Sequence, residues 1–248
     1  MRNIKLVLEY DGSAFFGFQK QPHQPTIQES LETALTSFFG RRMKIAAASG
    51  RTDAGVHAAG QVVNFKTSNA RELEKIQRGL NALLPHSIVV KRIEEVPADF
   101  HARYSICSKT YEYSIWNHPL RSPLVAGRVL HVIHPLEVIP MRRAARSLIG
   151  THDFRSFTSV AAFKHRSISC VRTIKKISIQ KQRSLIRIRV EADGFLYHMV
   201  RNIVGTLIEV GKGKRSPEEI TAILEAKDRR FAGMTAPSVG LMLLKASY

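Results

Sequence analysis

The chain has 248 residues, 44% of them hydrophobic, which is enough to bury the core of one large domain or of two small ones. Lysine and arginine number 38 against 20 acidic residues, a formal net charge of +18 at pH 7. An enzyme of small neutral substrates does not require this excess. Because the basic residues are spread through ordered-looking segments, the charge indicates a polyanionic partner and favours a structured nucleic acid. The alternative is a generally basic, soluble protein.

The cysteine content indicates the cellular compartment. The chain has two cysteines, Cys107 and Cys170, which form no CxxC pair, so neither a disulfide framework nor a structural zinc site is indicated. The first residues, MRNIKLVLEYDG, lack the apolar region of a signal peptide, and no apolar run is long enough to cross a bilayer. We expect a cytoplasmic protein with no membrane partner.

The first half of the chain predicts strands and helices in the order βαββαβ. The first strand ends at the turn signal Asp11-Gly12. The first helix is expected after Pro25, because Thr26 and Glu29 have capping-box spacing and apolar residues then repeat at helical intervals up to Gly40. The predicted elements are strands 4–10, 43–49, 61–67 and 87–96 and helices 26–40 and 70–84.

The second half repeats this order with one additional helix. We therefore predict an α/β (α+β) protein of two ferredoxin-like, split βαβ domains, with residues 1–104 in the first and 105–248 in the second. A basic loop at 151–172 is too long for a simple connector, which suggests a functional insertion. The predicted elements are strands 109–117, 173–180, 185–192 and 240–247 and helices 135–150, 196–211 and 216–228.

The stretch GRTDAGVHAAGQV, residues 50–62, places Asp53 among glycines and alanines between two predicted strands. On physical grounds the simplest role for Asp53-Ala-Gly is a turn, since aspartate accepts local backbone N–H bonds and glycine tolerates positive φ. The predicted helix 196–211 is apolar on nearly every face but contains Arg201. A buried guanidinium there would need an anion from another segment, although the side chain could also extend to solvent.

Aromatic and basic residues alternate in KTYEY, HDFRSF and DGFLYHMVR. This interleaving is compatible with the stacking of RNA bases, while core packing is the alternative for each ring. The carboxylates and histidines do not cluster, and there is neither a P-loop nor a GxGxxG motif. We therefore expect no metal and no cofactor.

Six blocks in order carry a resemblance that runs nearly from end to end: GRTDAGVHAAGQV, YDGSAFFGFQKQPHQPTIQESLE, FHARYSICSKTYEYSIWN, GTHDFRSF, DGFLYHMVRNIVG and APSVGLML. They resemble the tRNA pseudouridine synthases of the TruA family. Phe18 stands where tryptophan is usual, and Ser238-Val239 stand where a second proline and a different residue are usual.

The resemblance implies a catalytic role for Asp53, which answers why an acid lies in this stretch. It also implies that Tyr111 stacks on the uracil and is a candidate for assisting proton removal from C5, and that Arg201 pairs with the aspartate. By the same resemblance, Arg51 is the candidate for taking the vacated space in the RNA and holding the flipped nucleotide. His57, Gln61 and Phe195 lie in matching blocks and either contact substrate or have a structural role.

The same resemblance implies one pseudouridine synthase fold with a central, mostly antiparallel sheet and a basic cleft between its halves. It implies tRNA positions 38, 39 and 40 in the anticodon stem-loop as targets, and a homodimer. Two other classes stay open: a non-catalytic protein that binds structured RNA, and an RNA nuclease or base-excising glycosidase.

Overall fold

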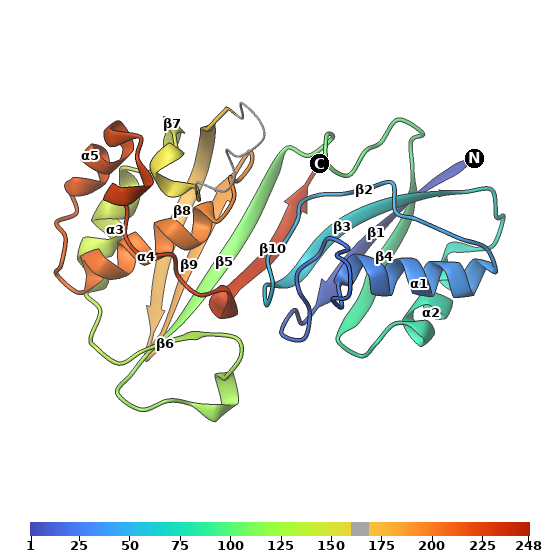
Figure 1. Ribbon diagram of the computed structural model, residues 1–248, viewed down its shortest axis with the longest axis horizontal. Coiled ribbons are helices and arrows are strands. Elements are labelled where there is room, and N and C mark those ends of the chain that lie inside the picture. Colours follow the sequence, from blue (N-terminus) through green and yellow to red (C-terminus); the bar gives the residue numbers. More distant parts are fainter. Residues whose placement is uncertain (160–168) are drawn as a thin grey trace. The chain divides into compact units, whose positions relative to one another are not determined.

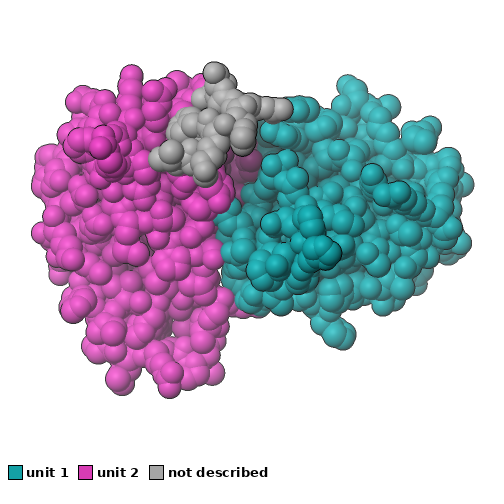
Figure 2. Space-filling view, viewed as in Figure 1, with its two compact units in different colours: residues 1–107, 242–248 teal, residues 108–241 magenta. Residues whose placement is uncertain are grey.

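The computed structural model describes residues 1–159 and 169–248, and its contacts divide the chain into two units. Unit 1 contains residues 1–107 and 242–248, and unit 2 contains residues 108–241 (Figure 2). The domain boundary that the sequence predicted, between residues 104 and 105, stays a prediction. Residues 242–248, which form most of the last strand, belong to unit 1 together with the N-terminal half of the chain. The sequence pattern had placed this strand in the second domain.

Unit 1 consists of a sheet with two helices (Figure 1). Its strands pair in the order β4-β1-β3-β10, with β2 also on β3; all pairs are antiparallel except β3 with β10. Alternate residues of β1 are buried, from Ile4 to Tyr10, as expected for a sheet covered on one face. The elements are β1 (Arg2–Tyr10), α1 (Ile27–Phe39), β2 (Ala47–Ala48), β3 (His57–Thr67), α2 (Leu73–Leu83), β4 (Ile88–Val96) and β10 (Leu241–Ser247).

Within unit 2 the strands pair in the order β5-β9-β8-β7, with β6 parallel to β5. Helix α4 has 11 buried residues among its 13, which explains why its sequence is apolar around almost its whole circumference. The elements are β5 (Ser108–Asn117), β6 (Leu130–Val132), α3 (Val138–Arg146), β7 (Gly150–Asp153), β8 (Val171–Gln182), β9 (Leu185–Ala192), α4 (Met199–Gly211) and α5 (Glu219–Ala226).

The fold is therefore the mixed α/β class with mostly antiparallel strands that the sequence predicted. The predicted loop 151–172 is wrong at both ends, because β7 covers its first residues and β8 begins at Val171. A 3-10 helix, Arg155–Phe157, follows β7. Residues 160–168 of this predicted insertion lie outside the described residues.

Candidate active site

Asp53 lies in the turn that connects β2 to β3. The Val56 N–H donates to the Asp53 carbonyl at 3.2 Å, and Gly55 has φ +76°, so the turn expected from Asp53-Ala-Gly is present. The Asp53 side chain is half-buried. A turn role and a catalytic role are compatible, because this turn hydrogen bond uses the backbone carbonyl of Asp53 and not its carboxylate.

The loop after β1 packs directly against this turn. Phe18 N–H donates to the Thr52 carbonyl at 3.0 Å, and Gly55 N–H donates to the Phe15 carbonyl at 3.2 Å. Gly17 has φ +92°, and a Cβ there would lie 2.7 Å from the Thr52 carbonyl oxygen. Glycine is thus required at position 17 for both the backbone conformation and the close approach.

A buried hydrogen-bond network holds the segment on either side of Arg51. The Gln61 side chain donates to the Gly50 carbonyl at 2.9 Å and accepts from Ser49 Oγ at 2.5 Å. On the other side of Arg51, Tyr10 Oη and Thr52 Oγ1 are 2.8 Å apart. Burial raises the pKa of Tyr10 to about 12, against the opposing effect of its hydrogen bonds. The network fixes the backbone that presents Arg51 and Asp53.

Two of the predicted substrate-contacting residues therefore have structural partners. Gln61 is fully buried, and its amide is used by the network described above. His57 is 5% exposed, and its Nδ1 lies 3.2 Å from Asp11 Oδ1 and 3.3 Å from the Gly12 nitrogen, which ties the loop after β1 to the start of β3. For both residues the geometry favours the structural alternative.

Arg51 differs from its neighbours because its side chain is exposed. Within residues 1–159 and 169–248, its guanidinium has no hydrogen bond or ion pair. An exposed guanidinium on a fixed backbone is suited to an anionic or planar ligand from outside the chain.

In unit 2 the structure brings Tyr111 and Phe195 together. Tyr111 lies on β5 and is 7% exposed, and Phe195 lies in the connection from β9 to α4. Their rings meet edge to face, with centroids 5.1 Å apart and planes at 88°. The contact fixes the orientation of the Tyr111 ring.

Arg201 lies in the first turn of α4 and is half-buried. Its Nε donates to the Ala236 carbonyl at 2.7 Å, and Ala236 N–H donates back to the Arg201 carbonyl at 3.1 Å. Tyr113 Oη donates to the next carbonyl, of Pro237, at 2.7 Å. The side chain of Arg201 is thus oriented by the segment 232–237. Asp53 belongs to unit 1 and Arg201 to unit 2, and their pairing stays a prediction.

Sequence reasoning missed the buried cluster that holds the segment 232–237 on α4. Thr235 Oγ1 donates to Asn202 Oδ1 at 2.6 Å and accepts from Arg229 Nη2 at 3.0 Å. Asn202 is fully buried and donates to the Phe157 carbonyl at 2.8 Å. The signal in the sequence was the pair of polar residues Asn202 and Thr206 within an apolar helix, because buried polar side chains need hydrogen-bond partners.

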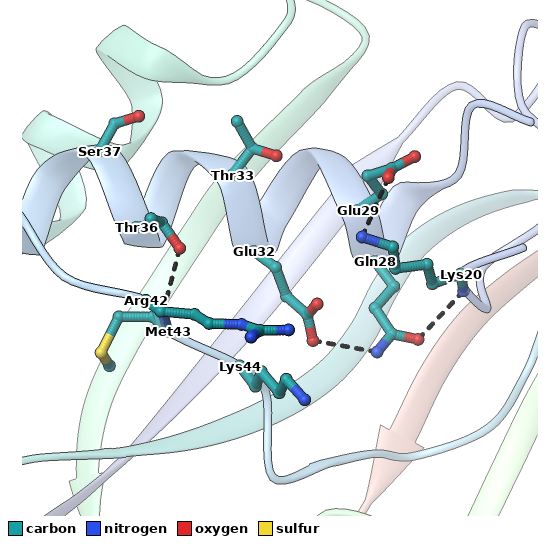
Figure 3. A pocket seen from close by; sticks show the side chains of 10 residues that line it. All are labelled: Lys20, Gln28, Glu29, Glu32, Thr33, Thr36, Ser37, Arg42, Met43 and Lys44. Atoms are coloured by element: carbon teal, nitrogen blue, oxygen red, sulfur yellow. Dashed lines mark hydrogen bonds and ion pairs between the residues drawn. The ribbon is translucent and has the colours of Figure 1, made fainter. Parts of the chain in front are cut away.

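A groove of about 390 Å³ lies elsewhere in unit 1, along α1 (Figure 3). Lys20 pairs there with Glu29 at 3.0 Å, and Glu32 accepts from Gln28 at 3.0 Å. None of the predicted site residues lines this groove, whose lining includes both basic and acidic side chains. We do not assign it to the site.

Among the described residues, no three His, Cys, Asp or Glu side chains are grouped as a metal ion would require. In the same part of the chain, no helix has both the length and the apolar character to cross a membrane.

Comparison with known proteins gives consistent similarities. A family model described as tRNA pseudouridine synthase matches residues 6–105 and 144–248, which include Asp53 and Arg201 but not Tyr111. The chain is 44% identical to tRNA pseudouridine synthase A of Acetivibrio thermocellus over the full length of both proteins. It is 46% identical to tRNA pseudouridine synthase A of Chromobacterium violaceum, over 99% of this chain and 92% of that protein.

A similarity to a solved structure is more distant. A Cbf5-Nop10-Gar1 complex aligns with 97% of this chain and 58% of its own chain, at a TM-score of 0.41 and 9% identity. No conclusion is drawn from a similarity at that level.

Proposed function

Because the chain belongs to the tRNA pseudouridine synthase family, we propose that it converts uridine to pseudouridine at positions 38, 39 and 40 of the tRNA anticodon stem-loop. The enzyme is an isomerase. In the proposed reaction the N1–C1′ bond of uridine breaks, the uracil turns over, and C5 bonds to C1′. The proton on C5 leaves and N1 gains one, so no atom is gained or lost and no oxidant or cofactor is needed.

We assign the first role in this reaction to Asp53. Its carboxylate acts on the uridine once the nucleotide has left the RNA stack, and unstacking costs a few kcal/mol that protein contacts must repay. Arg51 is assigned to holding the flipped nucleotide outside the stack. Its guanidinium is exposed, and the buried network fixes the backbone on both sides of it. We assign His57 and Gln61 to the support of this loop.

The roles proposed in unit 2 belong to Tyr111 and Arg201. Tyr111 stacks on the uracil, and Phe195 holds its ring at a fixed angle. Arg201 pairs with the carboxylate of Asp53, because a guanidinium donates two parallel hydrogen bonds to a carboxylate. The bond from Arg201 Nε to Ala236 fixes the direction of the guanidinium.

The proposal includes partners and a compartment. The anticodon arm of tRNA is the proposed substrate, and the net charge of +18 supports a polyanionic one. A homodimer and a cytoplasmic location belong to the same proposal, the second because tRNA is its substrate and the two cysteines fit a reducing compartment.

The observation that carries this proposal is the turn at residues 51–55, which contains Asp53 and is held by the loop after β1 and by the buried network of Tyr10 and Gln61. Asp53→Asn replaces this carboxylate with a neutral amide of nearly the same shape. We expect the variant to bind unmodified tRNA with unchanged affinity and to form no pseudouridine. Carbodiimide-dependent primer extension after a single turnover with EDTA present is the measurement.

The same assay separates the other two classes of function. A non-catalytic RNA-binding protein leaves the uridine unmodified even with the wild-type chain. A nuclease or a glycosidase shortens the RNA or releases free uracil. Near-wild-type pseudouridine formation by Asp53→Asn would remove Asp53 from its catalytic role.

A further inference from the structure

The segment His101–Ser105 of unit 1 forms a tight turn that presents an aromatic ring to solvent. The Tyr104 and Ser105 N–H groups donate to the His101 carbonyl at 3.0 and 2.9 Å. His101 N–H donates to Ser105 Oγ at 3.1 Å, and Arg103 N–H donates to His101 Nδ1 at 3.2 Å. Four hydrogen bonds within five residues make this turn a defined structure.

The turn is also anchored to the core of unit 1. Ala102 is fully buried; its N–H donates to Asn64 Oδ1 at 3.1 Å, and its carbonyl accepts from Tyr248 Oη at 2.7 Å. The residues on either side of this anchor therefore have fixed positions. A side chain that is exposed here is exposed on a rigid support.

Tyr104 is such a side chain, with 75% of its surface exposed. Its ring stacks on His101, with centroids 4.4 Å apart and planes at 25°, and the Arg103 guanidinium carbon lies 5.6 Å from the ring centroid. These neighbours orient the ring and leave most of it open to solvent. A further planar group could extend the stack by one ring.

Arg103 supplies an unneutralised positive charge beside the ring. In the described part of the chain, no carboxylate pairs with its guanidinium, and the Tyr104 hydroxyl has no hydrogen-bond partner. A flat apolar ring next to a free cation matches the two parts of a nucleotide, a base and a phosphate. An apolar protein partner fits less well, because the adjoining Ala102 is buried and contributes no exposed apolar surface.

We propose that an unpaired nucleotide of the RNA substrate stacks on Tyr104 and places its phosphate against Arg103. The inference rests on the proposed function, since it assumes an RNA substrate. The nucleotide must be unpaired, because bases within a duplex are already stacked on both faces. The contact contributes to RNA binding and has no part in the chemical step.

The test compares variants at constant salt by filter binding to unmodified tRNA. Tyr104→Ala is expected to raise Kd about 5- to 100-fold, the range for loss of one stacked base, whereas Tyr104→Phe keeps the ring and stays within about twofold. Arg103→Gln should weaken binding and reduce the salt dependence by about one phosphate contact.

Phe231→Ala is the matched control. Phe231 is also an exposed aromatic, 54% accessible, but its neighbour Arg230 is neutralised by Asp228 at 2.6 Å. This variant should leave Kd unchanged. A second control is a fully paired RNA duplex, whose binding Tyr104→Ala should not weaken.

The inference is wrong if Tyr104→Ala binds tRNA as the wild type does, or if it weakens duplex and tRNA binding equally. Its failure can be distinguished from that of the proposed function. Pseudouridine formation by the wild-type chain tests the function, whereas the Kd values test the stacking site.

Discussion

The proposed site residues differ in how firmly neighbouring groups hold their side chains. Arg51 is exposed without a partner in the described chain, while Tyr111 is 7% exposed and packed against Phe195. A side chain that inserts into RNA needs freedom to move, and a side chain that stacks on a reacting base needs a fixed plane. The structure fits the two proposed roles in this respect.

The proposed stacking role of Tyr111 is tested by separating its ring from its hydroxyl. Tyr111→Phe keeps the edge-to-face contact with Phe195, so it should retain most of the single-turnover rate. Tyr111→Ala removes the ring and should lower the rate at least about tenfold through lost orientation. A loss of about a hundredfold or more in Tyr111→Phe would instead require the hydroxyl for proton transfer.

The buried hydroxyl of Tyr10 predicts a specific alkaline sensitivity. Because the pKa of Tyr10 is raised to about 12 by burial, the folded chain keeps this proton while the unfolded chain loses it near pH 10. Between these values the folded state binds more protons, so stability falls as pH rises, by about 2–3 kcal/mol at most. Below pH 10 this contribution is fully present.

Tyr10→Phe removes the titrating group and makes this effect measurable. At pH 8 the variant should be about 1 kcal/mol less stable, because it lacks the bonds to Thr52 and Gln61. At pH 11 the difference should shrink or reverse, since other tyrosines and lysines titrate alike in both proteins. Urea unfolding at both pH values is the measurement, and a difference independent of pH would contradict the raised pKa.

At the scale of elements, the sequence predicted best where local signals and tertiary contacts agree. Helix α1 has Thr26 as its N-cap, with Thr26 Oγ1 accepting from Glu29 N–H at 3.3 Å, and Gly40 ends it in the left-handed conformation. The capping box and the glycine were both visible in the sequence.

One predicted strand is much shorter in the structure, because two of its backbone N–H groups donate to side chains and not to a neighbouring strand. The predicted strand 43–49 is reduced to Ala47–Ala48, since Met43 N–H donates to Thr36 Oγ1 at 3.1 Å and Ile45 N–H to Glu32 Oε1 at 3.2 Å. These acceptors lie on α1. Apolar alternation carries no information about such long-range acceptors.

The candidate site could also be predicted only in part, because some of its contacts join segments that are distant in the sequence. Asp53, Tyr111 and Arg201 were found through short motifs and a resemblance. The groups that hold their backbones, such as Tyr10 and Asn202, act through contacts between distant segments, and spacing in one sequence does not reveal these.

The segment 232–237 on α4 leads to a prediction at the element scale. Thr235→Val removes the hydroxyl that joins Asn202 and Arg229, which should cost about 1–3 kcal/mol and loosen the segment. Because the Ala236 carbonyl orients Arg201, the single-turnover rate should fall as well. Thr235→Ser should restore both.

Thr173→Val is a suitable control for this prediction. It removes an exposed hydroxyl of the same unit, which lies 2.9 Å from Thr151 Oγ1. The rate should then equal that of the wild type. If Thr235→Val lowers the unfolding temperature without lowering the rate, the segment does not position Arg201.

For the whole molecule, the main feature is an excess of positive charge that its own acidic residues do not neutralise. Several carboxylates already pair within the units, as Glu112 does with Arg189 at 2.6 Å and Glu209 with Arg215 at 2.6 Å. Because each ion pair uses one basic and one acidic group, the net charge of +18 is unchanged by such pairs and is available to a polyanion. The phosphates of tRNA are the proposed counterpart.

The consequence is a steep dependence of tRNA affinity on salt. Each phosphate that a lysine or arginine neutralises releases counterions, so the logarithm of the association constant falls linearly with the logarithm of salt concentration. With about six phosphates engaged, Kd should rise about a thousandfold between 50 and 200 mM salt. Filter binding with the Asp53→Asn variant, which is expected to form no pseudouridine, measures this without turnover. Unfolding temperatures at both salt concentrations establish that the fold is retained, and a flat response of Kd would show that phosphate contacts do not dominate the affinity.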